Sequence, residues 1–166
     1  MGDCLSKITY RDFEDMYSVK ATVYFIEIYK AFDKQDFLRL CETVRYYCQK
    51  DNVSYLFAFS TTDSKMAKPK YQMTGKRGRP RKVIQGKKVD GHIHNAFVGD
   101  KNKSCRQTIL KIAKAINKKE TKKITKINSI SNGVDVHDYA GYILRQSDII
   151  RSGGEFNFQE FYDKGI

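Results

Sequence analysis

The chain has 166 residues, of which 40% are hydrophobic and 13% aromatic, so it carries enough apolar material to fold and is excluded from the disordered class. No apolar run approaches the roughly 20 residues that a membrane-spanning helix needs, so no membrane span is predicted. The formal net charge is +12, and a basic chain of this kind attracts polyanions.

The predicted elements start with a strand and a helix. Residues 20–29 (KATVYFIEIY) are β-branched and aromatic in an unbroken run, which is typical of a central strand. Asp33 is placed as the N-cap of a helix that continues to about Lys50, because apolar residues recur at helical spacing along it. A second strand is predicted over residues 52–61 (NVSYLFAFST).

Four more elements are predicted in the second half of the chain. A third strand covers residues 88–99 (KVDGHIHNAFVG), and Ser104 is placed as the cap of a second helix with apolar residues at helical spacing. A fourth strand is predicted over residues 122–132 from its alternating pattern. Asp135 then opens a last helix that runs to about Ile150.

The order of these elements, β-α-β-β-α-β-α, is that of the split βαβ arrangement. We therefore predict an α+β fold, ferredoxin-like or RRM-like, with an antiparallel sheet, helices on one face, and the other face free to hold a polymer. Residues 1–166 are predicted to form a single domain with an extended basic hairpin inserted in it. The aromatic tail over residues 152–166 either caps the core or docks a partner.

The excess positive charge is concentrated in residues 62–88, which carry 10 Lys or Arg against 1 Asp or Glu. Residues 1–61 carry 8 against 9, and residues 89–166 carry 13 against 9. The basic segment also contains both prolines of the chain, so we expect a long connection or an extended hairpin there. Such a segment favours nucleic acid as the partner.

The centre of this connection, TGKRGRPRK, resembles an AT-hook, in which an extended Arg-Gly-Arg-Pro segment lies in a narrow A·T-rich minor groove. A hairpin that holds phosphates without base preference, or a solvated loop without a ligand, has the same composition. The predicted DNA-binding residues are Lys76, Arg77, Arg79, Arg81 and Lys82.

The four cysteines favour free thiols over a metal site or a disulfide framework. Cys4, Cys41, Cys48 and Cys105 form no CxxC or other zinc-binding spacing. Because unpaired buried thiols are typical of reducing compartments, we expect a cytoplasmic protein.

Two of the three histidines, His92 and His94, lie one residue apart in the stretch GHIHNAF. Side chains alternate along a strand, so both imidazoles lie on one face, while Ile93 and Phe97 point into the opposite, apolar face. Two imidazoles on one face can chelate a divalent metal when a third ligand arrives from another element. A pair of merely polar residues on a half-exposed strand is the alternative interpretation.

The last predicted helix offers candidates for the third ligand. Tyr142 lies about a quarter-turn from the buried stripe of this helix, and Gln146 lies one turn further along on the same side. A tyrosine and an amide can thus face the histidine-bearing sheet together. Tyr139 lies nearer the stripe and is either a packed aromatic residue or a second nucleophile. Glu27 and His137 are alternative third ligands.

Over roughly residues 20–150 the chain resembles the HUH (His-hydrophobic-His) endonuclease superfamily of replication initiators, relaxases and single-strand transposases. The HIH stretch at 92–94 matches the metal motif of that superfamily. Tyr142-Ile143-Leu144-Arg145 resembles its Tyr-x-x-Lys motif, with Arg145 in place of the lysine. Gln146 stands where the single-tyrosine transposases have their third metal ligand.

The resemblance implies a metal-dependent DNA endonuclease and strand transferase, with Tyr142 and Arg145 as catalytic residues and His92, His94 and Gln146 as ligands of Mn²⁺ or Mg²⁺. Its reaction would nick single-stranded DNA through a 5′-phosphotyrosine and initiate rolling-circle replication, as in plasmid replication initiator (Rep) proteins. A transposase or relaxase of the same superfamily, or a non-enzymatic DNA-binding protein, are the alternatives. The implied partners are single-stranded DNA with adjacent duplex at an origin or hairpin, and a host or fused helicase.

Overall fold

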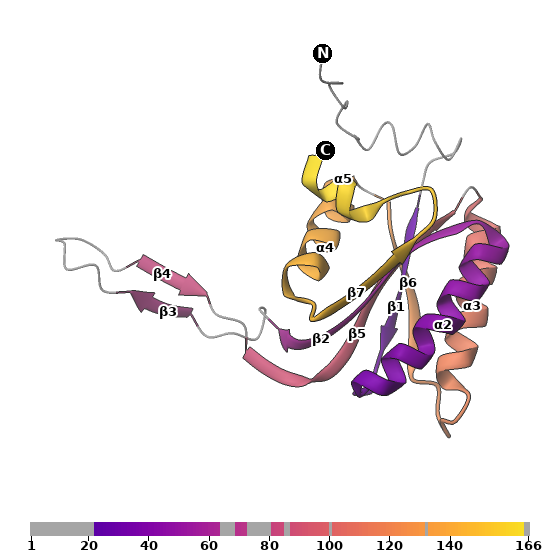
Figure 1. The fold of residues 1–166 in the computed structure, drawn as a ribbon, viewed down its shortest axis with the longest axis horizontal. Coiled ribbons are helices and arrows are strands. Elements are labelled where there is room, and N and C mark those ends of the chain that lie inside the picture. Colours follow the sequence, from indigo (N-terminus) through magenta and orange to yellow (C-terminus); the bar gives the residue numbers. More distant parts are fainter. Residues whose placement is uncertain are drawn as a thin grey trace, which may run out of the picture.

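The computed structural model describes residues 22–63, 69–72, 81–84, 87–99, 101–131 and 133–164. They form a five-stranded antiparallel sheet with four helices, and a separate two-stranded hairpin (Figure 1). The sheet has the order β6-β1-β5-β2-β7, with β1 (Val23–Ile28), β2 (Val53–Asp63), β5 (Lys87–Gly99), β6 (Thr125–Ile130) and β7 (Ile149–Gly153). The helices are α2 (Lys34–Asp51), α3 (Asn102–Asn117), α4 (Gly133–Gln146) and α5 (Phe158–Lys164). None of the helices in these ranges is long and apolar enough to cross a membrane.

The predicted α+β class is confirmed, and each predicted strand overlaps an observed one. Asp33 caps α2 as expected, because its side chain accepts a hydrogen bond from the backbone N–H of Asp36 at 2.8 Å. The order β6-β1-β5-β2 is consistent with the split βαβ arrangement, and β7 adds a fifth strand beside β2. The basic connection contains an antiparallel hairpin of β3 (Pro69–Gln72) and β4 (Arg81–Ile84), which confirms the hairpin alternative.

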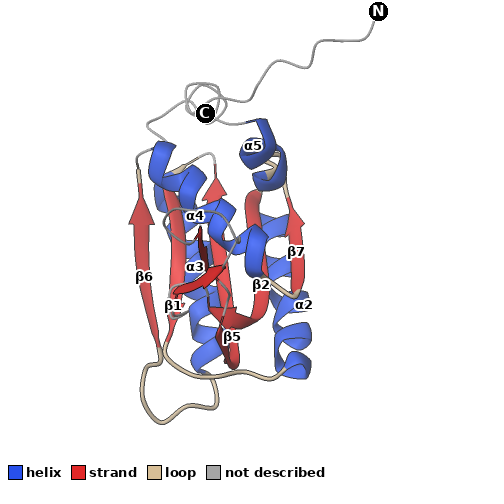
Figure 2. Ribbon diagram, turned by 90° about the vertical axis from the view of Figure 1, so that its left-hand side faces the viewer, coloured by secondary structure: helices blue, strands red, loops and turns tan. Residues whose placement is uncertain are grey.

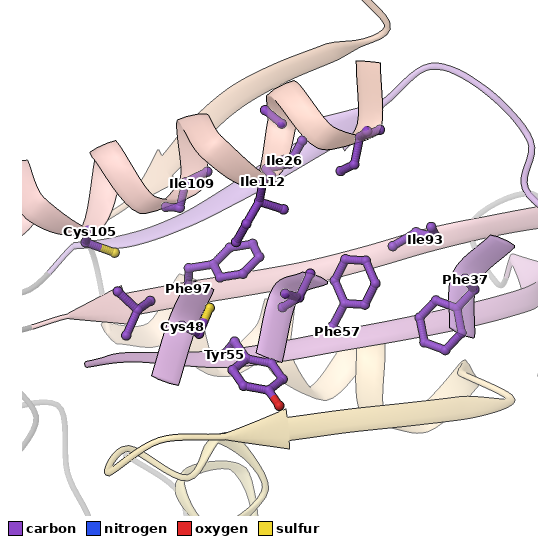
Figure 3. Close-up of a cluster of buried hydrophobic side chains, with 14 of the residues drawn as sticks. Ile26, Phe37, Cys48, Tyr55, Phe57, Ile93, Phe97, Cys105, Ile109 and Ile112 are labelled. Atoms are coloured by element: carbon purple, nitrogen blue, oxygen red, sulfur yellow. The ribbon is translucent and has the colours of Figure 1, made fainter. Parts of the chain in front are cut away.

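The prediction of helices on one face of the sheet is wrong, because helices cover both faces (Figure 2). Alternation along β2 separates two cores: Tyr55 and Phe57 point to the core under α2 and α3, and Leu56 and Ala58 point to the core under α4 and α5. Figure 3 shows the first of these cores, with aromatic rings from α2 and the sheet packed together. The free face that was expected to hold a polymer is therefore occupied by α4 and α5.

Three predicted helix boundaries are also wrong. Helix α4 begins at Gly133, so Asp135 lies in its first turn and does not open it. Helix α3 begins at Asn102 after Lys101, which makes no side-chain capping hydrogen bond, so Ser104 lies inside the helix and does not cap it. The last predicted helix ends at Gln146 rather than near Ile150, which belongs to the edge strand β7. The helix ends there because the following turn is bonded to β2: the backbone N–H of Asp148 donates to Phe59 O at 2.8 Å.

The aromatic tail caps the core. Phe156, Phe158 and Phe161 are buried, and they pack in the cluster formed by α4 and the sheet. The described cysteines are free thiols, as expected. Burial raises the pKa of Cys41 to about 11 and that of Cys105 to about 12, so both thiols keep their protons at neutral pH.

Candidate active site

The histidine pair lies on β5, the central strand of the sheet, on the face that α4 covers. His92 is paired with Ser60 of β2 and His94 with Ala58, and both imidazoles are half-buried. Their ring centroids are 4.7 Å apart with an interplanar angle of 89°. The residues opposite the two rings on β2 are therefore a small one, Ala58, and a polar one, Ser60, and neither is a large apolar side chain.

Local contacts orient the first histidine. The Nδ1 atom of His92 lies 3.0 Å from the carbonyl oxygen of Asp90, which favours a proton on Nδ1 and leaves the lone pair of Nε2 for a ligand. Gly91 allows the chain before α2 to approach β5 closely, since the N–H of Phe32 donates to Gly91 O at 2.8 Å. A Cβ atom at position 91 would lie 2.2 Å from Phe32 O. This orientation of His92 is the one that metal-binding histidines adopt.

Helix α4 places Tyr142 and Gln146 over the same region. The ring of Tyr142 stands edge-on to His94, with a centroid distance of 5.4 Å and an interplanar angle of 81°. Gln146 is the last residue of α4, and its backbone carbonyl lies 3.0 Å from the hydroxyl of Ser60. The Nε2 atoms of His94 and Gln146 are both withdrawn from solvent. The structure thus brings the ring of Tyr142 to His94, and the backbone of Gln146 to Ser60, which is paired with His92.

Both ends of this arrangement are held by contacts outside the site. Past the end of α4, the carboxylate of Asp148 accepts hydrogen bonds from the N–H and the hydroxyl of Thr61, at 2.9 and 2.7 Å. On its outer side α4 packs tightly against α5, because a Cβ atom at Gly141 would lie 2.4 Å from the ring of Tyr162. The position of Tyr142 over His94 therefore depends on β2 and α5 as well as on α4.

Tyr139 is committed to a structural contact. Its hydroxyl donates to the carbonyl oxygen of Asn95 at 2.8 Å, and its ring contacts that of Phe25 at 4.9 Å. Burial raises the pKa of Tyr139 above its ordinary value, so the phenol stays protonated at neutral pH. These contacts make Tyr139 a packed aromatic residue, the first of the two alternatives that its position on the helix allowed.

Asn95 is a residue of this region that sequence reasoning missed. Its fully buried side chain accepts from the N–H of Ile26 at 2.6 Å and donates to Ile26 O at 2.9 Å, so at this position a side-chain amide takes the place of backbone pairing between β1 and β5. The carbonyl of Asn95 is thereby released to accept from Tyr139. A polar residue between Ile93 and Phe97 on the apolar side of β5 was the available signal.

Replacing Asn95 by leucine should lower the free energy of unfolding by about 2–5 kcal/mol, because the N–H and C=O of Ile26 would stay buried without partners. The free energy is measured by urea-induced unfolding. Asn128→Leu on the edge strand β6 is the matched control and should change it by less than about 1 kcal/mol. Equal stabilities of the two variants would contradict the bridging role of Asn95.

Two of the other predicted site residues, Arg145 and His137, lie against α5, and Glu27 lies on β1, the neighbour of β5. Arg145 donates to the hydroxyl of Tyr162 at 3.1 Å and is exposed, so it is tied to α5. His137 also contacts α5, with its Nε2 3.1 Å from Tyr162 O. Glu27 of β1 accepts a hydrogen bond from the hydroxyl of Tyr29, which directly follows that strand. Across the described ranges, no three His, Cys, Asp or Glu side chains form a group that could hold a metal ion.

The predicted DNA-binding residues fall mostly beyond this geometry. Lys76, Arg77 and Arg79, with the Gly-Arg-Pro core, lie outside the described residues. Arg81 and Lys82 lie in β4, where the backbone alone is described. Their contact with DNA stays a prediction.

Neutralising Arg77, Arg79, Arg81 and Lys82 with glutamine should make the salt dependence of duplex binding shallower, by up to about 0.9 in the log–log slope for each phosphate that the variant no longer neutralises. The slope is measured by titrating A·T-rich and G·C-rich duplexes at several salt concentrations. Loss of a preference for A·T-rich duplex would support the AT-hook interpretation, and an equal decrease in affinity for both duplexes would support phosphate binding alone. An unchanged slope would contradict any DNA binding by these residues.

Similarity to known proteins assigns no role to these residues. A scan of protein-family models found no match to the chain. Comparisons with curated proteins and with solved structures also found no match.

Proposed function

We propose that this protein is a tyrosine-type single-strand DNA endonuclease and strand transferase, with the initiation of rolling-circle replication as its role. The observation that carries the proposal is the edge-on position of the Tyr142 ring, 5.4 Å from His94, over a histidine pair on the central strand. The strand order, consistent with a ferredoxin-like sheet, agrees with the fold of the HUH superfamily that the motifs resemble.

The residues supply a nucleophile and a place for the scissile phosphate. The hydroxyl oxygen of Tyr142 attacks phosphorus, a Tyr–O–P bond forms, and the bond from phosphorus to the 3′ oxygen breaks. The proton from the tyrosine leaves to a base, and the departing 3′ oxygen takes up a proton. The resulting 5′-phosphotyrosine conserves the phosphodiester bond energy, so a 3′-hydroxyl can reverse the step and rejoin or transfer the strand.

The donor set fits a divalent cation. His92 presents Nε2 because Nδ1 is directed at Asp90 O, and the Nε2 atom of His94 is buried. Gln146, at the end of α4, carries an amide oxygen of the type that these cations accept as a ligand. These three residues would hold Mn²⁺ or Mg²⁺, which when bound would polarise the scissile phosphate. Ser60 and Ala58 of β2 lie beside the pair in the sheet, and α4 covers this face.

A covalent adduct tests the proposal. The full chain is incubated with a labelled single-stranded oligonucleotide and Mn²⁺, and the mixture is denatured and separated by electrophoresis. A labelled band that survives denaturation and disappears after protease treatment is expected. Binding of the oligonucleotide without any adduct, over a range of origin-like and hairpin sequences, would favour the non-enzymatic DNA-binding alternative and contradict the proposal.

A further inference from the structure

A second concentration of positive charge lies away from the basic connection, in residues 101–126. This segment carries 10 Lys or Arg and a single acid, Glu120. Glu120 is itself ion-paired with Lys30, from outside the segment. By contrast, residues 127–166 carry 3 Lys or Arg against 6 Asp or Glu. The positive charge of the second half of the chain is therefore gathered on α3 and on the turn that follows it.

The Lys and Arg side chains of α3 form a stripe on its outer side. The apolar residues of the helix, such as Ile109 and Ile112, face the sheet and pack in the core shared with α2. Lys103, Arg106, Lys114 and Lys118 are exposed and recur at three- and four-residue spacing, with one step of the row taken by Leu110. From Lys103 to Lys118 the row rises by 15 residue steps, or about 22 Å, which corresponds to about six base pairs of duplex.

The turn between α3 and β6 continues the row with Lys122 and Lys123, both exposed. We call these six residues the α3 basic surface: Lys103, Arg106, Lys114, Lys118, Lys122 and Lys123. Within the part of the chain that the structure describes, none of the six is ion-paired with a carboxylate. Lys111, which belongs to the same helix, is paired with Asp51 of α2 at 3.5 Å and is left out of the surface.

The composition of the surface selects the class of partner. Leu110 is the only large apolar side chain exposed on α3 within the described ranges, with 48% of its surface accessible. A protein interface needs a buried apolar centre, and a membrane-surface helix needs an apolar face beside its bases, so neither partner fits a row of cations around one leucine. A regular, extended polyanion does fit.

We propose that the α3 basic surface binds the phosphate backbone of duplex DNA, as a second nucleic-acid site on the face of the sheet opposite the histidine pair. The sheet lies between α3 and α4 (Figure 1). Helix α3 packs on the core that contains Ile93 and Phe97, whereas the ring of His94 contacts Tyr142 of α4. A phosphate bound at α3 is therefore distinct from a phosphate at Tyr142. This site carries no sequence information and holds the duplex by charge alone.

The experiment compares two charge-matched variants of the full chain. In the first, Lys103, Arg106, Lys114 and Lys118 are replaced by glutamine. In the control, four exposed Lys and Arg residues of α2 are replaced in the same way: Lys34, Arg39, Arg45 and Lys50. The binding of a random-sequence duplex of about 20 base pairs is titrated at several salt concentrations.

The α3 variant should show a log–log salt slope shallower than that of the wild type by up to about 3.6, or about 0.9 for each cation removed from the DNA backbone, and the α2 control should keep the wild-type slope. A third variant, with Lys103, Lys114 and Lys118 changed to arginine, should also keep it, because only the charge is required. An unchanged slope in the glutamine variant, or an equal change in the α2 control, would overturn the proposal.

Two further readouts keep the outcomes separate. Vesicles that contain phosphatidylserine are tested in the same assay, and an α3-dependent binding to vesicles without any α3-dependent binding to duplex would overturn the assignment to DNA. Adduct formation on a short single strand should be the same in the α3 variant as in the wild type. Duplex binding by the α3 basic surface is therefore tested independently of the nicking reaction.

Discussion

Replacing Tyr142 by phenylalanine is expected to lower the rate of covalent adduct formation by at least about 1,000-fold, because no oxygen remains there to attack phosphorus. The ring and its contact with His94 at 5.4 Å are kept, so the free energy of unfolding should change by less than about 1 kcal/mol. The rate is measured from denaturation-resistant adducts on a labelled oligonucleotide, and the stability is measured by urea-induced unfolding.

Tyr139→Phe is the matched control and should give the reverse result. Its hydroxyl donates to Asn95 O, so its removal should cost about 1 kcal/mol of stability and leave most of the adduct. An inactive Tyr139→Phe beside an active Tyr142→Phe would show that the other face of α4 carries the chemistry. Full adduct formation by both variants would contradict the tyrosine mechanism itself.

Replacing both His92 and His94 by alanine should remove the binding of divalent metal and lower the nicking rate by more than about 100-fold, which exceeds the usual effect of a residue that only orients a ligand. Binding of Mn²⁺ is followed by calorimetry, independently of the nicking assay. Affinity for single-stranded DNA should be retained, because the substitutions remove no Lys or Arg and most of these residues lie outside β5.

His137→Ala is the control for the histidine pair. It removes the same type of side chain from a position whose Nε2 contacts Tyr162 O on α5, so the binding of Mn²⁺ should be that of the wild type. Nicking by the wild type at an unchanged rate in excess EDTA would contradict the metal role of the pair. Loss of Mn²⁺ binding in the His137→Ala variant would place the metal near α5.

The sequence predicted the strands of this fold better than its layers. Apolar periodicity located β1, β2, β5 and β6, since each strand is set by its own local pattern. The second helix layer was missed although β2 contains a signal for it: residues 55–59 are apolar without interruption, which is typical of a strand that is buried on both faces. Both faces of β2 are in fact buried: Tyr55 and Phe57 point into one core, and Leu56 points into the other.

Within the site, local periodicity predicted which side chains share a face, and tertiary contacts decided the rest. The placement of Tyr142 and Gln146 on one side of α4 follows from helical spacing alone. The end of α4 could not be predicted, because it depends on the capture of Asp148 by Thr61, 87 positions away in the sequence. The attachment of Arg145 to Tyr162 is a contact of the same long-range kind.

The irregularity in the pairing of β2 with β5 has a consequence for how the length of this chain can vary. From Val53 to Ser60 the two strands pair residue by residue, and the register shifts between Ser60 and Thr62, immediately past the position of His92. A deletion of one residue of β5 between His94 and Gly99 would turn the imidazoles to the opposite face of the sheet, into the core under α2 and α3. The segment between Thr62 and Lys88, which contains β3 and β4, can gain or lose residues while the pairing from Val53 to Ser60 keeps its register. Insertions can therefore accumulate in this segment without disturbing the site.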